Sequence, residues 1–126
     1  MRRPIRVERG RAGERLARQL LEREGFQIEA ANVRFPVGEI DLVAREGATL
    51  CFVEVRSSRS EKFGGAISSI TDRKRHHLIR AAQWYLKRLR DVPDAVRFDV
   101  VVIEQEGDEA PRLELIRSAF DASGYW

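Results

Sequence analysis

The sequence has very little cysteine and no long apolar run, and each absence excludes a class of protein. Its 126 residues include one cysteine, Cys51, which rules out an intrachain disulfide framework and a cysteine-rich zinc cluster. Cys51 lies among core residues, so we expect it to pack there rather than act as a nucleophile. No uncharged apolar stretch approaches the ~20 residues of a membrane-spanning helix, and the arginine-dense start lacks the apolar stretch of a secretory signal. We therefore expect a protein of the reducing cytoplasm that does not enter a membrane.

Internal repeats and low-complexity tracts are also missing. Hydrophobic residues make up 43% of the chain and are evenly spread, which excludes a disordered protein. A chain of 126 residues suits one core and leaves little room for a second. We expect a single domain over residues 1–126, with a basic N-terminal arm at 1–9 and a short C-terminal tail at 117–126.

Charge is unevenly distributed, although the formal net charge is only +3. Residues 1–23 carry eight arginines against three glutamates, and residues 56–90 carry ten basic residues against two acids. The segments 24–55 and 91–126 are acidic. Two basic blocks around an acidic middle are typical of a surface that binds a phosphate backbone, provided that the blocks converge in the fold. The alternative is a set of solvated helix faces in an arginine-rich protein.

Apolar periodicity predicts two helices, at residues 11–24 and from about 72 to 90. Gly25 ends the first helix, and Thr71 or Asp72 can cap the second. Alternation or β-branched composition predicts five strands, at residues 26–33, 39–45, 49–57, 97–103 and 112–116. The resulting order, αβββαββ, favours an α/β fold in which helices flank a mixed β-sheet over a helical bundle or a β-sandwich.

Two acids on an otherwise apolar hairpin carry the functional prediction. If the loop between the second and third strands is residues 47–48, antiparallel partners have numbers that sum to 95, which sets Asp41 opposite Glu54. Glu39 then faces Arg56. Facing residues have Cβ atoms ~4.5 to 5.5 Å apart, close enough for two carboxylates to share one hard divalent cation.

The facing carboxylates need a partner, because like charges that face each other oppose folding. Magnesium meets this need, and it also polarises a phosphate and lowers the pKa of a bound water. Without a metal, Arg56 neutralises Glu39 and Glu54 in a cross-strand ion network. A loop at residues 46–47 would leave Asp41 diagonal to Glu54, still within reach of a shared ion. The residues alone leave the metal site and the ion network equally open.

Four motifs, in this order and spacing, resemble those of one protein family. They are GRAGE at 10–14, GEIDL at 38–42, FVEVR at 52–56 and RFDVV at 97–101. Over roughly residues 9–116 the chain resembles the uncharacterised YraN-like bacterial family, which is similar to Holliday-junction-resolvase-type nucleases of the PD-(D/E)xK superfamily. The resemblance implies a restriction-endonuclease-like core and a phosphodiesterase site that depends on Mg²⁺ or Mn²⁺.

The resemblance also implies roles for particular acids. Asp41 and Glu54 match the two metal-binding acids of the superfamily. Glu14 matches the first-helix glutamate that helps to hold the metal or its water, and the alternative for Glu14 is a solvated helix face. Glu39 is a further candidate metal ligand.

Basic residues are assigned to nucleic acid by the same resemblance. Lys74, with its neighbours Arg73 and Arg75, matches the basic start of the second long helix and is expected to contact DNA or the active-site phosphate. Residues 57–66 are polar and contain two glycines, so we expect an exposed loop that touches the ligand. The other expected contacts to nucleic acid are Arg11, Arg59 and Lys62.

One residue departs from the superfamily pattern, because Arg56 stands where a lysine is expected. Arginine stays protonated, so it cannot remove a proton from water. Three outcomes remain open: Arg56 acts only electrostatically, another lysine such as Lys62 or Lys74 takes over, or the site is catalytically weak.

We therefore expect a metal-dependent endonuclease that acts on branched or damaged DNA in repair or recombination. Its expected catalytic residues are Asp41, Glu54, Arg56 and Glu14. The expected partner is branched or duplex DNA, and the resemblance adds a homodimer, because two scissile strands call for two sites. The alternative is a nucleic-acid-binding accessory protein of the same fold with little or no hydrolytic activity. A protein-interaction domain that binds no nucleic acid is the third interpretation.

Overall fold

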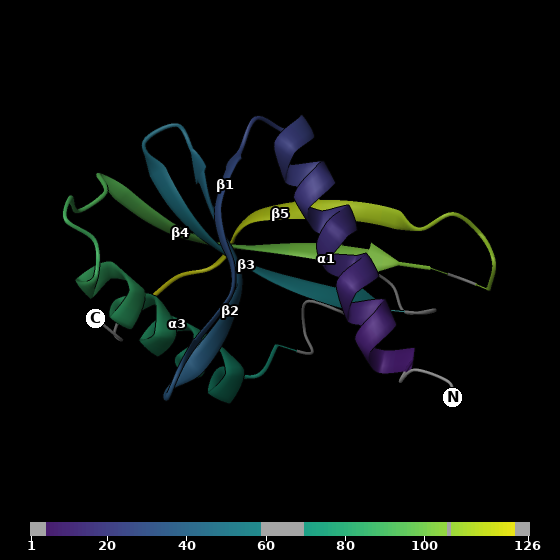
Figure 1. Ribbon diagram of the computed structural model, residues 1–126, viewed down its shortest axis with the longest axis horizontal. Coiled ribbons are helices and arrows are strands. Elements are labelled where there is room, and N and C mark those ends of the chain that lie inside the picture. The colour runs from purple at the N-terminus through teal and green to yellow at the C-terminus, as the bar shows by residue number, and fades with distance from the viewer. Residues whose placement is uncertain (1–4, 59–69, 106, 123–126) are drawn as a thin grey trace.

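The computed structural model describes residues 5–58, 70–105 and 107–122 (Figure 1). Within these residues, two helices and five strands follow one another in the predicted order αβββαββ, consistent with a restriction-endonuclease-like fold. Neither helix is long and apolar enough to cross a membrane. The elements are α1 (Ile5–Arg23), β1 (Gln27–Phe35), β2 (Gly38–Glu46), β3 (Thr49–Ser58), α3 (Asp72–Lys87), β4 (Ala95–Glu104) and β5 (Arg112–Phe120).

The five strands form one mixed sheet in the order β1-β2-β3-β4-β5. Neighbouring strands are antiparallel, except for β3 and β4, which run parallel along their whole length. A parallel pair needs a long crossover connection, and α3 lies in the segment that joins β3 to β4. Both sides of β3 are therefore bonded to other strands, and β3 is a central strand of the sheet.

The helices cover opposite faces of the sheet (Figure 1). On one face, Leu21 of α1 packs with Cys51 and Val53 of β3. On the other face, Ile79 of α3 packs with Phe52 of β3. Successive residues of a strand point to opposite faces, so the run of buried residues along β3 supplies both cores. Glu54 follows in this alternation on the α3 face.

The ends of α1 differ from the prediction only at the start. The helix begins at Ile5 rather than Arg11, so much of the expected basic arm is helical. Gly10 does not prevent this, because one glycine inside a helix costs only ~1 kcal/mol relative to alanine. Gly25 ends the helix as predicted, with φ +96 and with its N–H donating to the carbonyl of Glu22 at 3.1 Å.

The last strand is longer than the sequence predicted and extends to Phe120 instead of ending at Ile116, so residues 117–120 belong to β5 rather than to a tail. Ser118 makes this extension possible. It takes a positive φ of 53° in an irregular part of the β4–β5 pairing, and its N–H donates to Asp99 Oδ1 at 3.0 Å. A side-chain acceptor on the neighbouring strand thus replaces a regular ladder bond at that point.

Asp99 of the RFDVV motif is a structural acid. It is fully buried and accepts two hydrogen bonds from Arg97, both at 2.8 Å. It pairs with Val53 across the parallel strands, so its side chain lies on the α1 face, opposite to Glu54. The guanidinium of Arg97 balances the charge of Asp99. This ion pair explains the two charged residues of the RFDVV motif without a catalytic role.

Cys51 packs as predicted. It is fully buried in the core beneath α1, and burial raises the pKa of its thiol to about 12. A thiol with such a pKa stays protonated at neutral pH and is a poor nucleophile.

Candidate active site at the fork between two strands

The hairpin of β2 and β3 has the predicted register. Its paired residues run from Glu46 and Thr49 to Leu42 and Val53, and every pair sums to 95. The loop is residues 47–48, where Gly47 takes a φ of +61° that glycine adopts without steric cost. The alignment of the two strands is therefore the one predicted from a loop at residues 47–48.

The two strands separate directly after this ladder. Pairing between β2 and β3 stops at Leu42 and Val53, whereas β2 stays bonded to β1 as far as Gly38. On the other side, β3 stays bonded to β4 as far as Ser58. The sheet thus forks, and the first residues beyond the last pair are Asp41 and Glu54.

Asp41 and Glu54 meet in this fork. The charge of Glu54 acts directly on the side chain of Asp41, whose Oδ2 accepts the backbone N–H of Val55 at 2.8 Å. The carboxylate of Asp41 therefore takes a strand N–H that the ladder no longer pairs. The prediction that these two carboxylates face each other is confirmed.

Glu39 does not face Arg56, contrary to the prediction. The antiparallel ladder that would align them ends at Leu42, and Glu39 instead pairs with Arg34 of β1, whose Nε lies 3.2 Å from Glu39 Oε2. The prediction failed because the strands diverge, which a register rule does not foresee. Glu39 still lies close enough for its charge to act on Asp41.

Burial and repulsion set the protonation of the pair. Glu54 is only 5% exposed. Burial and the adjacent charge of Glu54 together raise the pKa of Asp41 to about 7, although the N–H of Val55 acts in the opposite direction. At neutral pH Asp41 is therefore partly protonated, unless a cation displaces the proton.

Two cationic side chains reach the same carboxylate. Lys74 Nζ lies 3.1 Å from Glu54 Oε2, and Arg56 Nη1 lies 3.7 Å from that oxygen. Arg56 follows Glu54 by two residues on β3, whereas Lys74 comes from the first turn of α3. Lys62 and Lys74 are the two lysines that could replace the one expected at position 56. Lys74 lies in the site, and Lys62 lies outside the described residues.

The start of α3 is held over the fork by a cap and a close contact. The hydroxyl of Thr71 accepts the backbone N–H of Lys74 at 3.1 Å, which fixes the first turn. Gly38 of β2 lies so close to α3 that an added Cβ would be 2.7 Å from the carbonyl oxygen of His77. The absence of a side chain at Gly38 lets the helix approach, and this approach brings Lys74 to Glu54.

These residues surround a hollow of about 340 Å³, which we call the carboxylate hollow. Its acids are Asp41, Glu54 and Glu39, and its basic side chains include Arg73 and Lys74. Thr71, His77, Leu78 and Gly38 complete the lining. The hollow therefore places acidic oxygens, which attract a cation, next to basic groups, which attract a phosphate.

The donor set fits a hard divalent cation. Magnesium is commonly bound by one or two protein carboxylates, with water and substrate phosphate completing its shell. Asp41 and Glu54 supply two such oxygens at one point. Among the described side chains, no group of three His, Cys, Asp or Glu is arranged to hold a metal. Asp41 and Glu54 could therefore hold Mg²⁺ or Mn²⁺ as two carboxylate ligands.

Glu14 makes its contacts elsewhere. Its Oε1 accepts from the side-chain amide of Asn32 at 2.6 Å, and its Oε2 lies 3.4 Å from Arg18. The contact with Asn32 links α1 to β1, whereas Arg18 belongs to α1 itself. The role of Glu14 as a metal ligand stays a prediction.

The expected nucleic-acid contacts are placed in different ways. Arg73 lines the carboxylate hollow with Lys74, whereas the guanidinium of Arg75 lies 5.6 Å from the ring centre of Phe120. Arg59 and Lys62, like the side chain of Arg11, lie outside the described part of the chain.

The sequence alone missed Gly38, Thr71 and His77 as parts of the site. Thr71 was visible as a helix cap and Gly38 only as part of the GEIDL motif, but neither signal reveals what the residue contacts. The adjacent His76 and His77 could contact a phosphate, but neighbouring residues on a helix point in different directions, so the sequence assigns His77 no role. Only the packing of α3 on β2 brings these residues together with the carboxylates.

Comparison with known proteins identifies relatives along almost the whole chain. The model of the uncharacterised protein family UPF0102 matches residues 13–103, which include all residues of the carboxylate hollow. A UPF0102 protein of Desulfosudis oleivorans is 44% identical over 118 residues, covering 94% of each chain. One of Symbiobacterium thermophilum is 44% identical over 113 residues, covering 90% of this chain and 96% of the relative. One of Ectopseudomonas mendocina is 46% identical over 114 residues, covering 90% and 94%.

Proposed function

The chain belongs to the uncharacterised protein family UPF0102, and from the carboxylates that meet in its fork we propose that it is a metal-dependent endonuclease that hydrolyses phosphodiester bonds in DNA. The observation that carries the proposal is the adjacent pair of carboxylates of Asp41 and Glu54 in the lining of one hollow, with Lys74 Nζ at 3.1 Å from Glu54. Such a pair is costly to fold, because burial and repulsion both disfavour its second charge. A site that binds a divalent cation explains why the chain carries it.

Asp41 and Glu54 are the residues that would hold the metal. When bound, Mg²⁺ supplies Lewis-acid polarisation of a phosphate oxygen and lowers the pKa of water. Asp41 must lose its proton before both carboxylates can bind a cation, so binding is expected to release a proton. Metal binding at this site should therefore strengthen as the pH rises through about 7, the pKa of Asp41.

The two cationic side chains have different capacities. Arg56 stays charged and can only stabilise the negative charge that develops on the phosphate. Lys74 carries its charge on a flexible stem and can also exchange a proton. We assign to Lys74 the role that the superfamily gives to a lysine two residues after the second acid, and to Arg56 an electrostatic role.

A nuclease assay tests the proposal directly. Single-stranded, duplex, flap and four-way DNA are incubated with the protein and Mg²⁺ or Mn²⁺. Cleavage should disappear in Asp41→Asn and Glu54→Gln and persist in Glu24→Gln, a surface acid in the turn after α1. Cleavage that survives both site variants would refute the assignment.

The alternative is an accessory protein that binds nucleic acid through the same fold and hydrolyses it slowly or not at all. Arg56, in place of lysine, is the observation that favours it. This alternative predicts salt-sensitive binding to DNA without divalent ions and no cleavage by the wild-type protein. Cleavage that appears only in Arg56→Lys would identify a weakened nuclease.

A further inference from the structure

A second hollow adjoins the carboxylate hollow along α3. Its volume is about 600 Å³, and it shares Gly38, Glu39 and His77 with the carboxylate hollow. Its other polar side chains are Arg34 of β1 and His76 and Arg80 of α3. The two hollows are therefore neighbours, and His77 stands between them.

The two hollows differ in their acids. The carboxylate hollow contains Asp41 and Glu54, whereas Glu39 is the one acid in the lining of the second hollow. There it is already paired with Arg34, at 3.2 Å, and the guanidinium of Arg80 lies on the same lining. Guanidinium groups and imidazoles suit phosphate oxygens. A ligand that places a cation in the first hollow and a phosphate in the second fits both.

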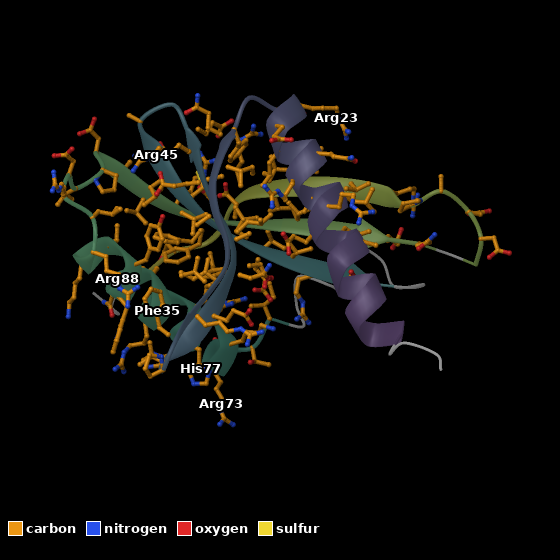
Figure 2. All side chains as sticks on the ribbon, in the orientation of Figure 1. Arg23, Phe35, Arg45, Arg73, His77 and Arg88 are labelled. Atoms are coloured by element: carbon orange, nitrogen blue, oxygen red, sulfur yellow. The ribbon has the colours of Figure 1, made fainter. Side chains whose placement is uncertain are left out.

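A row of four basic side chains and one tryptophan follows α3 along both hollows and past them. Arg73, His77, Arg80, Trp84 and Arg88 follow one another at spacings of three or four residues, which places them on one face of the helix. We call this face the α3 stripe. Figure 2 shows Arg73, His77 and Arg88 in succession along α3. At 1.5 Å per residue the stripe is about 22 Å long, which spans about six nucleotides at a rise of ~3.4 Å.

An exposed aromatic ring lies near the far end of the stripe. Trp84 is 38% exposed, and its ring centre lies 5.7 Å from that of Phe35, which is buried. The guanidinium of Arg88 lies 4.8 Å from the centre of the same Phe35 ring. The Trp84 ring is thus packed against Phe35 and still has surface exposed to solvent. Proteins that bind single strands stack nucleobases on such aromatic side chains.

We propose that the second hollow and the α3 stripe bind a single-stranded stretch of nucleic acid adjoining the bond to be cleaved. Its phosphates contact Arg34 and Arg80, and one base stacks on Trp84. Bases inside a duplex are already stacked on both sides, so Trp84 favours a strand with unpaired bases. This inference rests on the proposed function, which supplies the cleavage of a phosphodiester bond at the carboxylate hollow. It narrows the substrate to DNA with an unpaired strand beside that bond.

Metal-free binding tests the proposal without any cleavage. A fluorescent oligothymidylate about 12 nucleotides long, twice the length of the stripe, is titrated in EDTA at several salt concentrations, beside a duplex of equal length. The variants are Arg80→Ala, Trp84→Ala and Trp84→Phe. Arg23→Ala, at the far end of α1 (Figure 2), is the matched control for loss of one arginine. Thermal melting of each variant establishes that it is folded.

Three results are expected. Arg80→Ala lowers the salt dependence of single-strand binding by about 0.7 in log–log slope, the loss of one phosphate contact, whereas Arg23→Ala leaves it unchanged. Trp84→Ala weakens single-strand binding about tenfold and duplex binding much less. Trp84→Phe retains most of the affinity, because it keeps an aromatic face.

The proposal is overturned if Arg80→Ala and Trp84→Ala bind the oligonucleotide like wild type. It is also overturned if Trp84→Ala weakens single-strand and duplex binding equally. These measurements need neither metal nor cleavage, so a failure of the nuclease assay leaves them unaffected. Conversely, unchanged binding in these variants leaves the nuclease proposal standing. It removes only the proposal that the second hollow and the α3 stripe bind a single strand.

Discussion

The ammonium group of Lys74 lies 3.1 Å from a carboxylate oxygen of Glu54, although one residue belongs to α3 and the other to the central strand β3. A lysine two positions after Glu54 would reach the site from the same strand, but this chain has Arg56 there. The lysine near Glu54 therefore comes from helix α3, whereas strand β3 carries an arginine near the same carboxylate. This relationship makes the two cations experimentally separable.

Lys74→Ala should lower the cleavage rate about 100-fold or more, the scale of a lost proton-transfer group. Lys74→Arg should restore the charge but little of the rate, because arginine does not exchange protons at neutral pH. Adding Arg56→Lys to Lys74→Ala should recover part of the rate. Single-turnover cleavage assays check these expectations, and equal rates for Lys74→Ala and wild type would exclude a catalytic role for Lys74.

Without divalent ions, Asp41→Asn should be more stable than wild type above pH 8 and similar to it near pH 4. The pKa of Asp41 is about 7 in the folded protein, against an ordinary value of 3.8. The folded state therefore holds the proton of Asp41 more tightly than the unfolded state does. The contribution of this proton to the free energy of unfolding is complete below about pH 4 and is lost as the pH rises through about 7.

At ~1.4 kcal/mol per pKa unit the difference amounts to about 4 kcal/mol at most. Urea unfolding in EDTA across this pH range measures it, and comparing the two proteins cancels the contributions of other acids. A constant difference in stability at all pH values would show that Asp41 is not the group that titrates.

Gly38→Ala should displace α3 and weaken both stability and activity. The added Cβ would meet the carbonyl oxygen of His77 at 2.7 Å, which is backbone and cannot rotate away. We expect a loss of about 1–3 kcal/mol in the free energy of unfolding, together with slower cleavage. Gly13→Ala is the control, because its nearest contact is a flexible side-chain atom of Ile103 at 3.4 Å. Urea unfolding compares the two, and equal stability for both variants would contradict the close packing at Gly38.

Asp99→Asn should destabilise the fold without altering metal binding. The variant removes the buried countercharge of Arg97, which keeps its ion pair with Glu46 at 2.7 Å, so we expect a cost of about 1.5–3 kcal/mol. Asp99 lies on the face of the sheet opposite to Glu54, so the carboxylate pair should be unaffected. Thermal unfolding and Mn²⁺ titration of the folded variant check both parts, and a loss of Mn²⁺ affinity would show that Asp99 belongs to the site.

Local rules account for what the sequence predicted correctly. The register of the hairpin follows from the two-residue loop at Gly47, so the meeting of Asp41 and Glu54 was predictable. The end of α1 at Gly25 and the cap of α3 at Thr71 depend on neighbouring residues in the same way.

The remaining features depend on contacts between distant segments. The fork exists because β3 continues beside β4 while β2 continues beside β1, and no local pattern announces it. For this reason Glu39 was wrongly placed opposite Arg56. The extension of β5 depends similarly on a bond from Ser118 to Asp99 of the neighbouring strand.

The most direct test of the metal site is calorimetric titration of Mn²⁺ into the wild-type protein, Asp41→Asn and Glu24→Gln at pH 8. Wild type and Glu24→Gln should bind one ion with the same affinity, and Asp41→Asn should bind it about tenfold more weakly or worse. Equal affinity in all three proteins, or no binding by the wild-type protein, would contradict a metal site formed by Asp41 and Glu54.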